Sequence, residues 1–292
     1  SSMLDINLAN HLFSSLTSDT RLILIGDADQ LPPVEPGQPF RDLIDSGCFP
    51  VARLGGNHRQ GAGSDIASAS QRILSGKLPS PLTTDGFRFL ETKDDATTRD
   101  LVMREFRKYV EKMGPDSEDT GIQIITPMRT EEELGKRTLN VLAQGSFNRS
   151  DSDIFRNQNG TLFVGDKVIY TKNERELGLV NGDIGKIIAV TPEGVKVQFG
   201  TEVTLTEKFS EKLEAAYALT IHQSQGSEYP IVIIPVTMKH RFMLSRNLLY
   251  TAITRARDKV LVIGQKEALE HGVRSTRGFF RYTGLKELLK GT

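Results

Sequence analysis

The segment LILIGDADQLPPV, residues 22–34, gives the strongest indication of fold class in this chain. Its four consecutive apolar residues, Leu22–Ile25, are typical of a strand buried on both faces of a parallel sheet. Gly26 permits a sharp turn, and Asp27 and Gln30 then offer a carboxylate and an amide. Open α/β sheets bind ligands at the carboxyl ends of their strands. The segment therefore predicts an α/β fold with a phosphate-sensing loop, although Gly-Asp alone is more typical of an ordinary turn.

Short apolar runs and amphipathic stretches alternate along much of the chain. Strands are expected at Val51–Leu54, Phe87–Leu90, Gly121–Ile125, Ala216–Thr220, Ile231–Ile234 and Lys259–Ile263. Helices are expected from Asp5 to Leu16, at Phe40–Ile44, at Ser64–Leu74, from Ala96 to Lys112, after Arg129, at Leu248–Arg257 and at Gly284–Lys290. Strands that alternate with helices in this way predict a parallel sheet.

Residues 146–213 differ from this pattern, because they contain short β-like segments separated by turn signals. The segments are Lys167–Tyr170, Gly185–Val190, Val195–Phe199 and Val203–Leu205. Asn181-Gly182 and Glu193-Gly194 are the clearest turns between them. We expect a small β-barrel, inserted between two strands of the parallel sheet.

The length of 292 residues favours two domains with an inserted module. Residues 78–85 contain two prolines, two threonines and Ser80, which is typical of a linker. We therefore assign residues 1–80 to part of a first domain, residues 81–145 and 214–292 to a second domain, and residues 146–213 to the insertion.

Composition limits the classes of site and compartment. Lys and Arg together number 37, as do Asp and Glu, so the overall charge gives no sign of nucleic-acid binding. Cys48 is the only cysteine, which excludes an internal disulfide and a cysteine zinc site and fits a reducing compartment such as the cytoplasm. No apolar run approaches the roughly 18–20 residues that span a bilayer, so no membrane association is expected.

Phosphate-binding groups follow two of the expected strands. Arg59 lies at the start of a helix, where its planar guanidinium can bind a phosphate. Thr126 and Arg129 follow Gly121–Ile125 and can hold a backbone phosphate. Each has a simpler alternative, a solvated arginine or a helix cap, which would be favoured if its motif stood alone.

The segment from Thr220 to Glu228 also joins two expected strands. Gly226 allows a close backbone approach, and Gln225 offers a polar end. His222 suggests a catalytic base, but the sequence near it has no cysteine, no serine-acid pair and no second histidine at ligand spacing. Contact with a phosphate or a backbone is the better interpretation.

The segment Leu248–Arg257 has the spacing of an amphipathic helix. Leu249 and Ile253 fall on its apolar face, whereas Arg255 lies toward another face. This pattern presents Arg255 as a fixed cation.

Taken together, these strings resemble motifs of superfamily 1 helicases, most closely of the RecD/TraA branch. Motifs III, IV, V and VI of that family resemble the strings around Gln30, Arg59, His222 and Arg255. The resemblance covers nearly the whole chain. It implies the end of one RecA-like motor domain, a complete second one, and an SH3-like β-barrel insertion at residues 146–213.

The resemblance also implies residue roles. Catalytic roles would belong to Gln30, Arg59 and Arg255, the last as an arginine finger that stabilises charge on the phosphoryl oxygens. Nucleotide binding would belong to Asp27, Gln225, Gly226 and Glu228. Contacts with the DNA backbone would belong to Thr126, Arg129, Thr220 and His222.

The implied cofactors are ATP and Mg²⁺, but two elements that hold them are missing from the sequence. The phosphate loop G-x-x-x-x-G-K-[ST] is absent, because Gly76-Lys77, Gly135-Lys136 and Gly185-Lys186 lack its other residues. The Asp-Glu pair that precedes a similar Ser-Met-Leu-Asp string in the family is absent too. We therefore expect the magnesium ligands upstream, assign no metal ligand here, and expect no ATP hydrolysis by this chain alone.

The function implied is that of the motor portion of an ATP-dependent 5′-to-3′ DNA helicase or translocase. Single-stranded DNA is the expected partner, with recombination or repair subunits as further candidates. Two alternatives stay open: a relative of the Pif1 and Dda helicases, and a DNA- or partner-binding portion without activity of its own.

Overall fold

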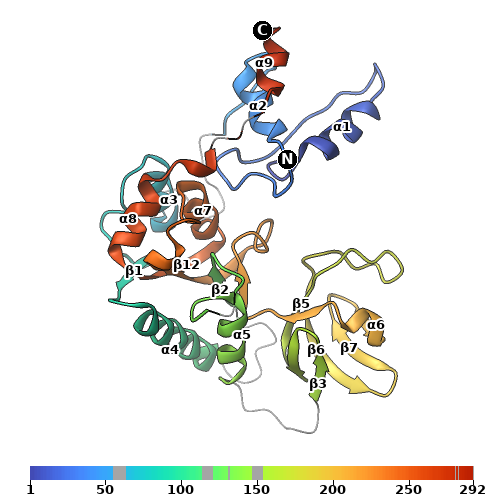
Figure 1. Ribbon diagram of the computed structural model, residues 1–292, viewed down its shortest axis with the longest axis vertical. Coiled ribbons are helices and arrows are strands. Elements are labelled where there is room, and N and C mark those ends of the chain that lie inside the picture. Colours follow the sequence, from blue (N-terminus) through green and yellow to red (C-terminus); the bar gives the residue numbers. More distant parts are fainter. Residues whose placement is uncertain are drawn as a thin grey trace.

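The computed structural model describes residues 1–54, 64–113, 121–130, 132–146, 154–279, 281 and 283–291 (Figure 1). Its centre is a five-stranded sheet in which all neighbouring strands are parallel. The strand order is β1 (Phe87–Glu91), β12 (Ala256–Gly264), β11 (Tyr229–Val236), β2 (Ile122–Thr126) and β10 (Ala218–Thr220). The predicted α/β class is confirmed.

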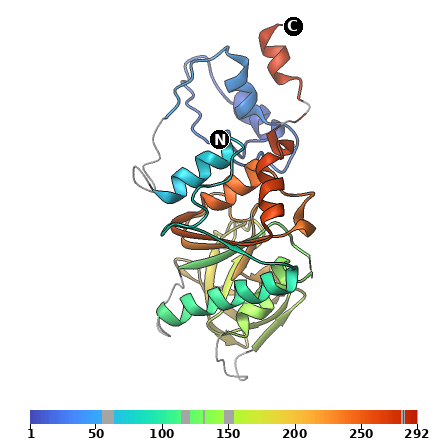
Figure 2. The same cartoon turned by 90° about the vertical axis from the view of Figure 1, so that its left-hand side faces the viewer.

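Helices cover both faces of this sheet, as Figure 2 shows for α3 (cyan) and α4 (green) on opposite sides of the strands. One face carries α3 (Asp65–Leu74), α7 (Arg246–Ile253) and α8 (Lys266–Arg274). The other face carries α4 (Asp95–Met113) and α5 (Lys136–Gln144). Successive strand residues alternate between the two cores: Val232 and Ile234 pack on the first, and Ile233 on the second. Both faces are therefore buried, which explains the unbroken apolar runs in the sequence.

The packing of α3 bears on the first predicted domain boundary. Ile66, Ala69 and Ile73 of α3 belong to the same core as the parallel sheet, so a boundary near residue 80 would divide that core. The same core also contains Leu31, and the division into domains stays a prediction.

An antiparallel β unit lies between α5 and β10 in the sequence and beside the parallel sheet in space (Figure 1). It contains a hairpin of β3 (Ile154–Asn157) and β4 (Gly160–Phe163). Its larger sheet has the order β8 (Glu202–Leu205), β7 (Gly194–Gln198), β6 (Ile184–Thr191), β5 (Lys167–Tyr170) and β9 (Leu213–Ala215), with α6 (Glu207–Ser210) before β9. A core of its own holds this unit together, and the four predicted strands all form.

Residues 1–54 form a smaller part that lies near both termini (Figure 1). It contains α1 (Ile6–Ser14), whose first turn is capped by the Asp5 carboxylate, and α2 (Pro39–Ser46). After the 3-10 turns η2 (Met238–His240) and η3 (Arg277–Phe279), the chain ends in α9 (Leu285–Lys290), which packs against α2.

Two predicted strands do not form. Leu22–Ile25 and Val51–Leu54 have no regular secondary structure, and the exposed fractions of Ile23 and Leu54 are 81% and 91%. A strand needs a hydrogen-bonded neighbour, and within residues 1–54 the structure contains no strand to pair with. The predicted helix at Leu248–Arg257 is also too long, because α7 ends at Ile253 and Ala256 already begins β12.

No helix among the described residues is both long and apolar enough to cross a membrane.

Candidate functional site

The loop that follows residue 26 packs against α7, and Asp27 is the main polar contact. The Tyr250 hydroxyl donates to Asp27 Oδ2 at 2.9 Å, and Gln30 Nε2 donates to the same oxygen at 3.1 Å. The backbone N–H of Asp29 donates to Asp27 Oδ1 at 3.0 Å. Asp27 therefore fixes the position of Gln30 and joins the loop to α7.

Backbone groups of the same loop contact two other predicted motifs. The buried Leu31 N–H donates to Thr251 Oγ1 at 2.8 Å, and Asn247 Nδ2 donates to the Asp29 carbonyl at 3.1 Å. Gln225 Nε2 donates to the Leu31 carbonyl at 3.2 Å. Three strings far apart in the sequence, around Gln30, Gln225 and Arg255, thus meet in one network.

Arg255 lies at the end of α7 and is buried. Its Nε donates to the Thr251 carbonyl and its Nη1 donates to the Ser227 carbonyl, both at 3.1 Å. The guanidinium is therefore a fixed cation, as the sequence predicts, but it is held by backbone carbonyls and less accessible than the helical pattern suggests. Gly226, which precedes Ser227, has a φ of +84°, a conformation that favours glycine, and Glu228 is exposed.

The local electrostatics follow from burial and from neighbouring carboxylates. Burial, with the nearby charge of Asp27, raises the pKa of Asp29. Burial also raises the pKa of Tyr250, and the negative charge of Asp27 and its hydrogen bond from the Tyr250 hydroxyl add to the effect. Tyr250 therefore remains a neutral hydrogen-bond donor to Asp27 at ordinary pH.

The predicted DNA-contacting residues lie at the carboxyl ends of β2 and β10, but they are not equally accessible. Thr126 is buried, and its hydroxyl donates to the Leu134 carbonyl at 2.6 Å. Its hydroxyl therefore shapes the loop before α5. The Arg129 side chain is 66% exposed, and its Nη2 donates to Glu214 Oε1 at 3.1 Å.

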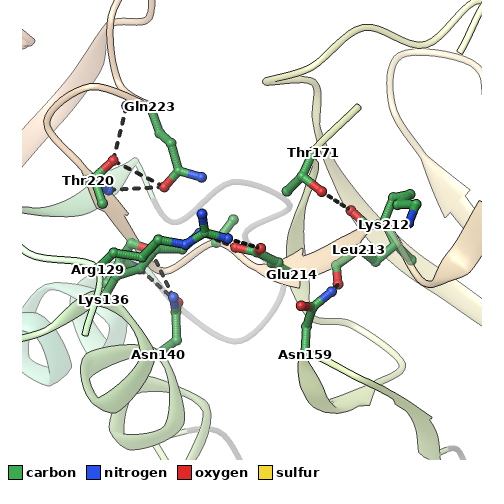
Figure 3. Close-up of polar contacts among 12 residues, drawn as sticks. Arg129, Lys136, Asn140, Asn159, Thr171, Lys212, Leu213, Glu214, Thr220 and Gln223 are labelled. Carbon is green, nitrogen blue, oxygen red and sulfur yellow. Dashed lines mark hydrogen bonds and ion pairs between the residues drawn. The ribbon is translucent and has the colours of Figure 1, made fainter. Parts of the chain in front are cut away.

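Glu214 also holds Lys136, so two cations share its carboxylate (Figure 3). The Lys136 side chain is only 2% exposed. Its burial lowers the pKa of Lys136, while the paired carboxylate of Glu214 opposes that change. Glu214 lies on β9 and Lys136 on α5, so this ion pair joins the antiparallel unit to the parallel sheet.

The sequence prediction missed Lys136 and Glu214. A usable signal exists for Lys136, because it shares the spacing i, i+3, i+4, i+7 with the buried residues Leu139, Asn140 and Ala143. A lysine on the apolar face of a helix requires a carboxylate partner. The sequence offers no comparable signal that the partner is Glu214.

A tight turn follows β10 and places His222 at the surface. The Gln223 N–H donates to Thr220 Oγ1 at 3.2 Å, and the Thr220 N–H donates to Gln223 Oε1 at 3.2 Å (Figure 3). Thr220 therefore stabilises the turn from within. His222 is exposed, although the surrounding protein desolvates it enough to lower its pKa.

One predicted catalytic residue, Arg59, lies outside the described residues. Among the residues described, no group of three or more His, Cys, Asp or Glu side chains is placed to hold a metal ion. The structure thus brings Asp27, Gln30, Gln225 and Arg255 together, and it places Arg129 and His222 at a second surface, where the buried Thr220 supports the turn that carries His222.

Comparisons with protein families identify helicase-related regions at both ends of the chain. Residues 215–263 match the UvrD-like helicase C-terminal domain, and residues 1–96 match an AAA domain.

Curated relatives extend this similarity over nearly the whole chain. The ATP-dependent RecD2 DNA helicase of Deinococcus radiodurans is 34% identical over 270 residues, which cover 91% of this chain and 36% of the relative. The RecBCD enzyme subunit RecD of Mycolicibacterium smegmatis is 27% identical over 315 residues, covering 99% of this chain and 53% of the relative. The chain thus spans about a third to a half of the length of these relatives.

Solved structures confirm the fold. The Pif1 helicase from Candida albicans superimposes with a TM-score of 0.55 at 19% identity, covering 99% of this chain and 75% of that one. A Bacteroides Pif1 helicase in complex with ADP-AlF3 and single-stranded DNA gives a TM-score of 0.50, also at 19% identity, covering 81% of this chain and 60% of that one. The parallel sheet therefore has the arrangement found in RecA-like helicase structures.

Proposed function

On the premise that this chain corresponds to part of the RecD-like helicases of superfamily 1, we propose that it is the motor portion of an ATP-dependent DNA helicase or single-stranded DNA translocase. The observation that carries the proposal is the network that links Asp27 and Gln30 to α7 and Arg255. A change at a phosphate near Gln30 would act directly on α7, whose Thr251 carbonyl holds Arg255.

The nucleotide side of this network would include Gln30 and Arg255 as catalytic groups. In our proposal Gln30 senses the γ-phosphate, and Arg255 stabilises charge that develops on the phosphoryl oxygens. Asp27, Gln225, Gly226 and Glu228 would line the nucleotide. Arg59 is proposed as a second γ-phosphate contact from its sequence alone.

Magnesium ligands are not assigned to this chain. A divalent cation with ATP needs carboxylates or similar oxygen ligands, and the described residues offer no suitable cluster.

The DNA side would run along the loops that follow β2 and β10. Arg129 and His222 are exposed there, whereas Thr126 and Thr220 shape the loops that present them. We propose further that the antiparallel unit of β5 to β9 is an SH3-like insertion that lies beside the DNA. Movement is proposed to run 5′ to 3′, as the RecD-like similarity implies.

A comparison of Arg255→Ala with Arg257→Ala in the complete protein tests the catalytic assignment. Arg257 is two residues away, exposed, and paired only with its neighbour Asp258 in the described structure. We expect Arg255→Ala to lower kcat for DNA-stimulated ATP hydrolysis by about 10³ or more while DNA affinity stays nearly intact, because the arginine acts on transition-state charge. Arg257→Ala should change neither quantity appreciably.

Arg255 is buried, so the folding of each variant should be verified by thermal unfolding. If DNA affinity falls as far as turnover in a folded Arg255→Ala protein, Arg255 belongs to the DNA surface. Unwinding of substrates with only a 5′ or only a 3′ single-stranded tail tests polarity, and preference for the 3′ tail would reject the proposed direction.

An assay of ATP hydrolysis also distinguishes the motor portion from the alternative, a binding portion without activity of its own. ATP turnover by this chain alone, stimulated by single-stranded DNA, would contradict our expectation that the phosphate-binding elements lie elsewhere.

A further inference from the structure

An open groove lies between the proline-rich loop that follows Gln30 and the loop that follows β11. Its volume is about 550 Å³, within the range of roughly 300–1,000 Å³ typical of ligand sites. The floor consists of the buried side chains of Leu244 and Leu248, and Pro32 and Val34 form one wall. The groove is therefore apolar at its base and accessible from outside.

The lining of the groove includes an unusually exposed aromatic side chain. The Phe242 side chain is 72% exposed, and Met243 beside it is also exposed. Large apolar side chains that gather on a surface around a groove usually mark a binding site. The Arg241 guanidinium lies over one face of the Phe242 ring, so the other face is the one available to a ligand with an apolar or aromatic face.

The charge around the groove is positive. The Arg241 guanidinium lies 4.6 Å from the centroid of the Phe242 ring, and Arg277 is exposed at the rim. His222 adds a hydrogen-bonding imidazole. None of the residues that line the groove is an aspartate or glutamate. A ligand that is anionic as well as partly aromatic fits this surface best.

The groove also continues the edge of the sheet at which the DNA contacts are proposed. β10, β2 and β11 are neighbours and run parallel, so the loops that follow them emerge at the same edge. Arg129 follows β2, His222 follows β10, and Phe242 follows β11. His222 and Phe242 both line the groove, and Arg129 emerges at the same edge of the sheet, so one extended strand can contact all three.

We propose that this groove binds single-stranded DNA, with one base stacked on Phe242 and the adjoining phosphate near Arg277 and His222. Aromatic stacking beside a cationic rim is the usual chemistry of sites that hold single strands without sequence preference. The inference rests on the proposed function and adds a base-stacking site to it. Because Pro32 and Val34 lie in the loop that carries Gln30, a strand in the groove contacts the loop that would sense nucleotide.

Equilibrium binding of fluorescent oligothymidine to the complete protein tests the site, with Phe242→Ala compared with Phe49→Ala. Phe49 is another exposed phenylalanine, located after α2 and outside the groove. Phe242→Ala should weaken binding by about 5-fold to 100-fold, as expected for the loss of one stacked base. Phe242→Tyr keeps an aromatic ring and should bind as tightly as the unchanged protein. Phe49→Ala should bind as the unchanged protein does.

Two further readouts separate stacking from a structural effect. In a series of oligonucleotides that each lack one base, one position should be found at which the missing base weakens binding to the unchanged protein but not binding to Phe242→Ala. Arg277→Gln should reduce the slope of log K against log salt by about one, whereas Phe242→Ala should leave it unchanged.

Distinct results would overturn this inference and the proposed function. If the unchanged protein binds single-stranded DNA and Phe242→Ala binds equally well, the stacking site is wrong and the proposed function stands. If the unchanged protein binds no single-stranded DNA, the proposed function itself fails. If Phe242→Ala leaves DNA binding intact but abolishes self-association in ultracentrifugation, a second copy of the chain occupies the groove instead.

Discussion

Two junctions join separate parts of this chain, and they are built from different chemistry. The loop of Asp27–Leu31 meets α7 through hydrogen bonds that Tyr250 and Asn247 donate and one that Thr251 accepts from the Leu31 N–H, and one of the acceptors is a carboxylate. The antiparallel unit meets α5 through Glu214, whose carboxylate lies between Lys136 and Arg129 (Figure 3). The first junction is mainly neutral, and the second is an ion pair with a buried member.

This difference has a mechanical consequence. A neutral hydrogen bond contributes about 1 kcal/mol net, since water or another group can replace either partner. A buried ammonium that loses its carboxylate has no such replacement, which makes the separation of the pair costly. The first junction is therefore suited to rearrange when a ligand changes, and the second is suited to hold the antiparallel unit in a fixed orientation.

Removal of the Glu214 charge should have the largest effect. Glu214→Gln should lower the free energy of unfolding by about 3–5 kcal/mol, because Lys136 stays buried without its anion. Chemical denaturation measures the loss. The double variant Glu214→Gln/Lys136→Met should recover most of it, and Arg129→Gln, which removes only the exposed arm, should cost less than about 1 kcal/mol. A loss as small for Glu214→Gln as for Arg129→Gln would refute the fixed character of this junction.

His240 is a buried titratable group that belongs to neither junction. Acid should destabilise the whole protein through it, so its effect is the reference against which the two junctions are compared. Burial lowers the pKa of His240 to about 4, against an ordinary value of 6.5. Between these values the unfolded chain binds a proton that the folded chain does not, so stability is complete above pH 6.5 and falls as the pH drops toward about 4. The loss should amount to about 3 kcal/mol.

Unfolding measured at several pH values between 4 and 7 should show this slope, and His240→Gln should flatten it. If the variant retains the full slope, another group is responsible. The dependence of the free energy of unfolding on pH, measured for the Glu214 and Tyr250 variants, should then be corrected for the His240 contribution before the two junctions are compared.

Loss of the Tyr250 hydroxyl should have a moderate effect. Tyr250→Phe should lower the free energy of unfolding by about 1.5 kcal/mol, because a hydrogen bond to a charged carboxylate is lost while Gln30 still donates to Asp27. Tyr170→Phe is a matched control, since the buried Tyr170 hydroxyl has no partner among the residues that the structure describes. That control should be neutral or stabilising. A cost for Tyr250→Phe equal to that of Glu214→Gln would show that both junctions are equally rigid.

The smallest effect should come from a surface ion pair in the antiparallel unit. Lys196 and Glu202 are 3.2 Å apart, and their side chains are 35% and 50% exposed. Glu202→Gln should change the free energy of unfolding by only about 0.2–1 kcal/mol, and the change should shrink in high salt. A larger cost would indicate that charge alone, independent of burial, strengthens the unit.

Sequence periodicity was sufficient for most secondary structure in the parallel sheet. The strands β1, β2, β10, β11 and β12 form where apolar runs predict them, and Asp5 and Ser64 cap the helices expected after them. These features depend on residues close together in the chain, so local patterns specify them. The meeting of the Gln30, Gln225 and Arg255 strings was expected only through the family resemblance, and the structure supplies the contacts.

The individual contacts of the site depended on tertiary structure. Thr126 and Arg129 are three residues apart, yet one is buried in its own loop and the other is exposed. Glu214 is 78 residues from Lys136, and only the packing of β9 against α5 brings them together. No local pattern encodes a partner at that separation.

Two apolar runs mark the limit of what the sequence alone determines, Leu22–Ile25 and Ile122–Ile125. Both are apolar runs of the kind that fill buried strands, and in that sense the sequence determined that each could form one. Ile122–Ile125 lies between β11 and β10 and is fully buried. Leu22–Ile25 has no strand beside it among the described residues and stays largely exposed. The physical reason is that β structure is completed by hydrogen bonds from a neighbouring strand, and a neighbour belongs to the tertiary structure.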